Sequence, residues 1–219
     1  MSVAEHWGRT AVVELLRAHG ADDPVDRATA QVRALWDEIG DWFAVHAPPC
    51  AEQLRAGTGA SPAAVQALAV AVGHHLPVDL RAHFQLYGGN GGGMFFEYAG
   101  LSVDAALGRW RDLAELRRQG TFDGWAPGEL DTEEELVEPV WWSPAWLPFA
   151  EDSGGNLYCV DLAPARRGVR GQVIAWEVHG GPVGPMASSF EAYLSRYRDQ
   201  FRSGRYRYDL DSGIFDDAD

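Results

Sequence analysis

The sequence contains no lysine, so its 18 basic residues are all arginines, and 32 acidic residues outnumber them. The net charge of -14 disfavours nucleic acid as a partner, because phosphate backbones are bound by positive surfaces. A basic protein partner fits this charge better. Aromatic residues make up 11% of the chain, which is enough for a large buried core and excludes a fully disordered protein.

Cysteine is also scarce, since Cys50 and Cys159 are the only two and cannot make a disulfide framework. Cys50 follows two prolines and is expected in a loop, whereas Cys159 lies in an apolar run. No secretory signal is visible, and the apolar stretch 63–72 is too short to cross a bilayer. These features predict a cytoplasmic protein with reduced thiols and no membrane contact.

The spacing of apolar residues changes along the chain from helical to alternating. Apolar residues at helical spacing, with capping residues and glycine stops, predict a series of helices: 3–20, about 30–47, 62–72, 77–87, 103–114 and 189–202. Shorter apolar runs predict strands: 94–98, 146–150, 157–162 and 172–178, with 205–209 as an edge strand. This order predicts an α+β fold with a mostly antiparallel sheet and helices packed on it.

We divide the chain into three parts. Residues 1–28 form an N-terminal helical extension, 29–208 form the main domain, and 209–219 form an acidic tail that we expect to be mobile.

Several patterns suggest catalysis or ligand binding, but each has a plainer explanation. The glycine run at 88–93 lies between a helix and a strand, the reverse of a phosphate loop, so we interpret it as a turn. His74, His75, Asp79 and His83 lack the spacing of a metal site. We therefore predict no metal and no cofactor.

Two other sets of residues could support hydrolysis. Cys159 and His179 could form a nucleophile pair, but a thiol in an apolar strand tends to be inert. Glu151, Asp152 and Asp161 flank the turn at 154–156 and could act as acids and bases, although carboxylates beside such a turn more often bind its backbone. We predict no catalytic residues.

The segment 129–138 carries six acidic residues and no basic one, and two tryptophans follow it. Tryptophan is a favoured anchor in protein interfaces, but these two could equally pack in the core. We predict that this segment binds a partner, through Glu133, Glu134, Glu135, Glu138, Trp141 and Trp142.

Three stretches from about 30 to 200 resemble the SUKH superfamily. The first is Gly59-Ala-Ser-Pro with Leu68 and Gly73-His-His-Leu-Pro-Val-Asp-Leu-Arg81, and the second is Leu101 with the helix around Trp110. The third and most specific runs from Trp146-Leu-Pro-Phe-Ala-Glu-Asp-Ser-Gly-Gly-Asn to Pro164, with Gly171-Gln-Val-Ile174 after it. The positions that match the motif of the family are Trp146, Asp152, Gly154, Gly155, Asn156 and Asp161. The match leaves open whether they form a ligand site or a folding signature.

This resemblance implies a non-enzymatic α+β domain that binds proteins. Bacterial relatives commonly neutralise a cognate toxin, so our first hypothesis is an immunity-type protein that occludes a basic toxin domain. Fungal relatives regulate cell-wall synthesis, so the alternative is a regulatory scaffold or adaptor. A small-substrate enzyme that uses the carboxylates near the 154–156 turn is a third hypothesis. The sequence does not predict the oligomeric state.

Overall fold

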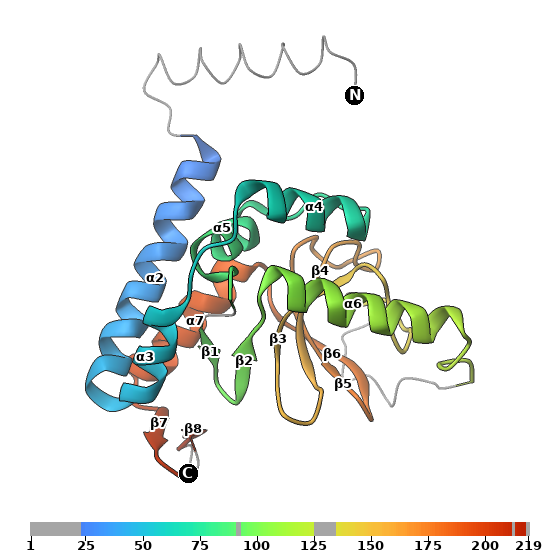
Figure 1. The fold of residues 1–219 in the computed structure, drawn as a ribbon. Coiled ribbons are helices and arrows are strands. Elements are labelled where there is room, and N and C mark those ends of the chain that lie inside the picture. The colour runs from blue at the N-terminus through green and yellow to red at the C-terminus, as the bar shows by residue number, and fades with distance from the viewer. Residues whose placement is uncertain (1–22, 91–92, 125–134, 212, 218–219) are drawn as a thin grey trace.

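The computed structural model describes residues 23–90, 93–124, 135–211 and 213–217, and Figure 1 shows their arrangement. The fold is α+β, as the sequence predicts. The helices of the described residues are α2 (Pro24–His46), α3 (Pro48–Ala56), α4 (Pro62–Val72), α5 (Val78–Tyr87), α6 (Val103–Arg118) and α7 (Phe190–Arg202). No helix among them is long and apolar enough to cross a membrane.

The strands form one curled antiparallel sheet and a separate hairpin. The sheet runs in sequence order through β1 (Met94–Phe95), β2 (Tyr98–Gly100), β3 (Trp146–Glu151), β4 (Leu157–Asp161), β5 (Val173–Glu177) and β6 (Gly181–Ala187). The hairpin consists of β7 (Tyr206–Asp209) and β8 (Gly213–Asp216). Each strand of the large sheet therefore pairs with its sequence neighbour.

The central strands β3 and β4 are buried on both faces, and their alternate side chains enter two different cores. Leu147, Tyr158 and Val160 face a first core, into which α2, α5 and α7 also pack. Trp146 and Cys159 face a second, smaller core. Strand β4 is buried along its whole length, which explains why its sequence is continuously apolar up to Asp161.

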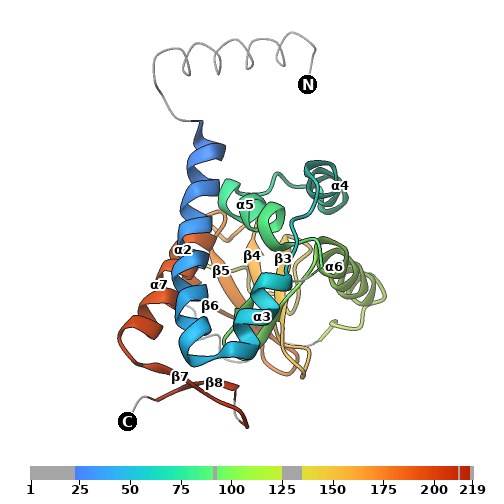
Figure 2. The same ribbon diagram turned by 60° about the vertical axis from the view of Figure 1, so that its left-hand side comes forward.

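The helices cover the first core from one side. Figure 2 shows α2 and α7 lying next to each other, with α5 beside them. Helix α6 runs along β3 and contributes to both cores: Val103 and Ala106 belong to the first, Leu113 to the second. This position brings the C-terminal half of α6 close to the turn that joins β3 and β4.

Several predicted helices agree closely with the structure. Helix α4 begins and ends where predicted, with the Ser61 hydroxyl accepting a hydrogen bond from the Ala64 amide and Gly73 in a left-handed conformation. Ser102 and Ser189 cap α6 and α7 in the same way. The predicted core residues of α7 are all buried: Phe190, Tyr193, Leu194, Tyr197 and Phe201.

Other predictions were wrong. The two prolines before Cys50 start helix α3 instead of a loop, and Cys50 is buried in that helix. The segment 94–98 is a hairpin of β1 and β2, with Phe96 at a positive φ of 62° in the turn. Strand β6 was missed altogether.

The acidic tail is also more ordered than predicted. Residues 213–216 form strand β8, and the Ile214 side chain is buried against the first core. The Arg205 guanidinium donates hydrogen bonds to both oxygens of the Asp216 carboxylate, and Arg207 pairs with Asp217. The predicted helix at 3–20 lies outside the described residues, and the domain boundaries stay a prediction.

Candidate functional site

The motif residues after β3 hold a tight turn. One oxygen of Asp152 accepts hydrogen bonds from the backbone amides of Gly154 and Asn156, both at 2.8 Å. Its other oxygen accepts from the Asn156 side-chain amide, also at 2.8 Å. The Asn156 side-chain carbonyl in turn accepts from the Val178 amide at the end of β5. Gly155 has a φ of 86°, which favours glycine at this position.

A second structural link lies at the other end of β4. Asp161 is fully buried and accepts hydrogen bonds from the Ala163 amide and the Gln172 side chain. The same Gln172 amide donates to the Leu136 carbonyl at 2.8 Å. Burial raises the pKa of Asp161 to about 6, although its hydrogen bonds from Gln172 and Ala163 oppose this. The contacts of Asp152, Asn156 and Asp161 are thus those of a folding signature.

The tryptophans predicted as partner anchors are buried in the second core. Trp141 is 6% exposed and Trp142 is 1% exposed. Trp142 packs edge-on against both Trp146 and Trp176, and the Trp176 indole donates to the Trp141 carbonyl. Both tryptophans therefore pack in the second core, and their role in partner binding stays a prediction.

The acidic part of the predicted partner surface is only partly described. Glu133 and Glu134 lie outside the described residues. Glu135 and Glu138 are both exposed, and Glu135 forms an ion pair with Arg166. Their role in partner binding stays a prediction.

An apolar cleft lies between α6, the β3–β4 turn and the segment after β5. Its volume is about 400 Å³, which is in the range of ligand and side-chain binding sites. Its lining is mostly apolar, with Leu113, Leu116, Phe122, Trp141, Trp176 and Val178. Gly154 and Gly155 of the motif turn form part of its wall. We call this feature the α6 cleft.

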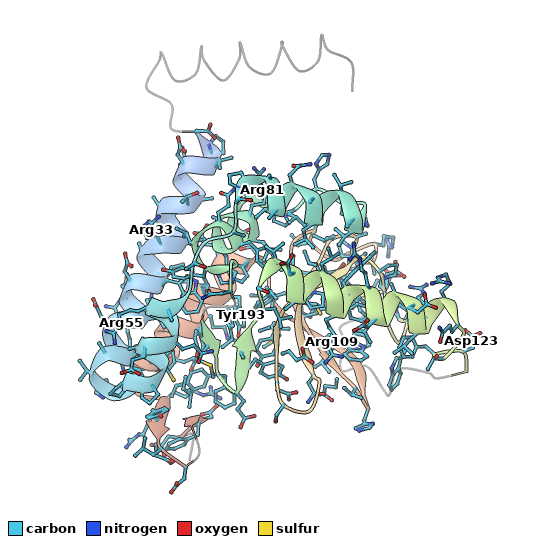
Figure 3. The ribbon with its side chains drawn as sticks, viewed as in Figure 1. Arg33, Arg55, Arg81, Arg109, Asp123 and Tyr193 are labelled. Atoms are coloured by element: carbon cyan, nitrogen blue, oxygen red, sulfur yellow. The ribbon has the colours of Figure 1, made fainter. Side chains whose placement is uncertain are left out.

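The polar residues of the α6 cleft are few. Arg109, labelled in Figure 3, reaches from α6 to form an ion pair with Glu151 at the end of β3. His179 and Thr121 also line the cleft. The Leu116 side chain is 38% exposed, so the cleft presents apolar surface to solvent. The arrangement suits an apolar side chain of a partner, held by shape and burial.

The candidate catalytic groups do not meet in this cleft. Cys159 is completely buried, and burial raises the pKa of its thiol, so the reactive thiolate is disfavoured. His179 lines the cleft but Cys159 does not. The carboxylates of Glu151, Asp152 and Asp161 bind Arg109, the turn backbone and Gln172 respectively, and none of them lines the cleft.

The histidines and the glycine run have structural surroundings. His83 is 1% exposed, accepts a hydrogen bond from the Trp36 indole and stacks among aromatic rings. Burial lowers its pKa to about 3, so it is neutral. Among the residues that the structure describes, no three potential metal ligands come together.

In the glycine run, Asn90 ties the end of α5 to the segment after α3. Its side chain accepts from the Thr58 amide and donates to the Ala56 carbonyl. This is the turn that the sequence predicted, as far as it is described; Gly91 and Gly92 lie outside the described residues.

The family model of the SMI1 / KNR4 family (SUKH-1) matches residues 59–196, which include α6, the motif turn and all strands from β1 to β6. The chain belongs to this family. The predicted resemblance is therefore confirmed.

Curated relatives come from fungi. A glucan synthesis regulatory protein of Neurospora crassa is 24% identical over 216 residues, covering 83% of this chain and 40% of the relative. A KNR4/SMI1 homolog of Yarrowia lipolytica is 32% identical over 100 residues, covering 46% of this chain and 14% of the relative. The cell wall biosynthesis/cell cycle regulator smi1 of Schizosaccharomyces pombe is 26% identical over 166 residues, covering 70% of this chain and 33% of the relative. The chain thus spans less than half the length of these relatives.

Reasoning from the sequence missed most residues of the α6 cleft. Leu116 follows Leu113 at i+3 and extends the stripe of Leu107, Trp110 and Leu113 toward the solvent-facing side of α6. This extension is the signal that could have indicated an exposed apolar surface. The contributions of Phe122, Trp176 and Val178 depend on tertiary packing and left no local pattern.

Proposed function

We propose that this protein is a non-enzymatic regulatory adaptor that binds a partner protein through the α6 cleft. The observation that carries the proposal is membership of a family in which curated relatives are named as regulators of glucan synthesis and of the cell wall. These names favour the regulatory alternative over the immunity-type hypothesis. They also favour binding over catalysis, in line with the dispersed carboxylates and the buried thiol.

The α6 cleft supports the proposal because it combines exposed apolar surface with a rigid wall. The motif turn is fixed by three hydrogen bonds to Asp152 and by the link from Asn156 to Val178. A preorganised wall reduces the entropy lost when a partner side chain enters. In this proposal the partner supplies a large apolar anchor.

The acidic residues before the cleft would help a basic partner to approach. The chain runs from exposed Glu135 and Glu138 to Trp141, which lines the cleft. Charges near an apolar anchor site mainly increase the rate of association and the specificity. The partner therefore carries basic residues next to its apolar anchor.

The experiment is a complementation test in the source organism. We expect deletion of the gene to alter the content of cell-wall polysaccharide, and the wild-type gene to restore it. Leu116→Glu places a charge in the cleft and should not restore it. Val70→Glu is the matched control, because Val70 is 70% exposed on α4, and it should restore the wild-type content.

The proposal fails if deletion leaves the cell wall unchanged, or if both variants complement equally. A neighbouring gene for a polymorphic toxin, together with loss of viability on exposure to that toxin, would instead support the immunity-type hypothesis.

A further inference from the structure

The loop that joins β4 to β5 carries three arginines and no acidic residue, although the chain as a whole has a net charge of -14. Arg166, Arg167 and Arg170 lie in this loop, at 162–172, and all three are exposed. Val169 lies among them, and its side chain is 54% exposed. We call residues 162–172 the arginine loop.

Two buried residues at the base of the arginine loop, Asp161 and Gln172, hold it in place. The backbone amide of Gly171 donates to the Asp161 carbonyl at 2.8 Å, and the Gln172 side-chain carbonyl accepts from the Val169 amide at 3.0 Å. The Gln172 side-chain amide also donates to the Asp161 carboxylate. The loop is therefore preorganised, which reduces the entropy lost when a partner binds.

The arginine loop packs against the start of α5. The Arg170 guanidinium donates a hydrogen bond to the His75 carbonyl. A Cβ added to Gly171 would lie 3.2 Å from the Pro77 ring, so the loop and the segment before α5 are in contact. Val78, the first residue of α5, is 40% exposed. Each of the two exposed valines lies within two residues of this contact, so they share one region of the surface.

Most of the positive charge on this surface is not compensated by the described residues. Arg166 pairs with Glu135. Within the part of the chain that the structure describes, no carboxylate pairs with Arg167, Arg170 or Arg81. Arg81, labelled in Figure 3, lies in the N-terminal half of α5. Arginine binds carboxylates through a planar fork of N–H donors, and such charge-assisted hydrogen bonds are strong.

We propose that the arginine loop and the start of α5 bind an acidic segment of a partner protein, with carboxylates on the arginines and an apolar side chain on the two valines. The sign of the charge on the partner follows from electrostatic complementarity. A short acidic segment fits better than nucleic acid or an anionic membrane, because the net charge of -14 repels extended polyanions.

This surface is separate from the α6 cleft. The arginine loop follows the C-terminal end of β4, whereas the motif turn, which forms part of the cleft wall, precedes its N-terminal end. The inference therefore does not rest on the proposed function.

Fluorescence anisotropy with a labelled synthetic peptide tests this proposal. The probe consists of glutamates around one central leucine, and its counterpart has glutamine in place of every glutamate. We expect the full-length protein to bind the glutamate peptide about tenfold or more tightly than the glutamine peptide. The double variant Arg167→Glu/Val169→Ser should weaken binding of the glutamate peptide about tenfold or more, because it reverses one charge and removes apolar surface.

Two controls accompany this variant. Arg111→Glu/Leu210→Ser makes the same kinds of change at exposed positions on α6 and after β7, and it should bind the glutamate peptide like the wild type. Leu116→Glu alters the α6 cleft and should also bind like the wild type, so failure of this proposal is distinguishable from failure of the proposed function. Urea unfolding verifies that each variant is folded.

Absence of binding, equal affinity for the two peptides, or affinity that survives Arg167→Glu/Val169→Ser would overturn the proposal. So would tighter binding of a single-stranded DNA oligomer or of phosphatidylserine vesicles than of the glutamate peptide, because the surface would then recognise phosphate groups instead of an acidic protein segment.

Discussion

Asp161 and Asp152 show how single carboxylates can fix a turn or loop without doing chemistry. Asp161 is completely buried, and burial raises its pKa to about 6. Asp152 is half-buried and accepts three hydrogen bonds within its own turn. The two residues therefore predict different effects of pH and substitution.

The first prediction concerns the pH dependence of stability. The folded-state pKa of Asp161, about 6, lies above the unfolded value near 4, so between these pH values the folded chain holds a proton that the unfolded chain has released. The free energy of unfolding should therefore fall as the pH rises from 4 to 7. Over this range the free energy of unfolding of the wild type should fall by about 2–3 kcal/mol more than that of Asp161→Asn. Urea unfolding at each pH measures this, and parallel profiles of the two proteins would contradict it.

The second prediction concerns the motif turn. Asp152→Ala leaves the amides of Gly154 and Asn156 without their acceptor, which should lower the free energy of unfolding by about 1–2 kcal/mol. Ser153→Ala is the control, because Ser153 is exposed in the same turn, and it should change stability by less than about 0.5 kcal/mol. Equal stability of the two variants in urea would show that the motif is not a folding signature.

At the scale of elements, a side chain of one helix caps another. Asp79 in the first turn of α5 is 6% exposed, and its carboxylate accepts a hydrogen bond from the Glu191 amide in the first turn of α7. The negative charge also suits the positive end of the α7 dipole. This contact joins two helices that are 112 residues apart in the sequence.

A third prediction follows from this link. Asp79→Ala should lower the free energy of unfolding by about 2 kcal/mol and speed hydrogen exchange at Glu191, because a partly buried donor loses its acceptor. Asp104→Ala is the control, since Asp104 is an exposed acid in the first turn of α6. It should lower the free energy of unfolding by less than about 1 kcal/mol. If both substitutions had the same effect on the Glu191 amide, the capping contact would not be stabilising α7.

The elements also show what the sequence can predict. Helices α4, α6 and α7 were predictable because serine caps and an apolar stripe agree locally. Strand β6 was not predictable from the sequence, because it contains two glycines and two prolines. It forms as an edge strand through its pairing with β5. Helix α2 ends before prolines 48 and 49 as predicted, but the loop expected at Cys50 is wrong, because proline also favours the first helical turn and here starts α3.

The candidate site was less predictable than the fold. The motif residues were found from the resemblance, and the backbone-binding role of Asp152 was expected from its place beside the turn. The α6 cleft joins α6, the β3–β4 turn and the end of β5, which meet only in the folded chain. Burial of Trp141 and Trp142 depends on the same tertiary packing, so the sequence could not choose between core and interface.

At the scale of the whole molecule, the large negative charge is partly compensated by local pairing. Arg205 and Arg207 pair with Asp216 and Asp217 across the hairpin, and Arg166 pairs with Glu135. These exposed pairs contribute little to stability but reduce the acidic surface that a partner can meet. The apolar α6 cleft is therefore a better candidate than net charge for determining which partner binds.

Quantitative co-purification of the tagged full-length protein from its source cells tests this central claim most directly. The account predicts that a defined partner is retained by the wild type and by Val70→Glu, and that Leu116→Glu reduces its recovery about tenfold or more, because a charge then lies in the apolar anchor site. Circular dichroism should show that all three proteins are equally folded. Equal recovery of the same partner with Leu116→Glu and with Val70→Glu would contradict binding through the α6 cleft.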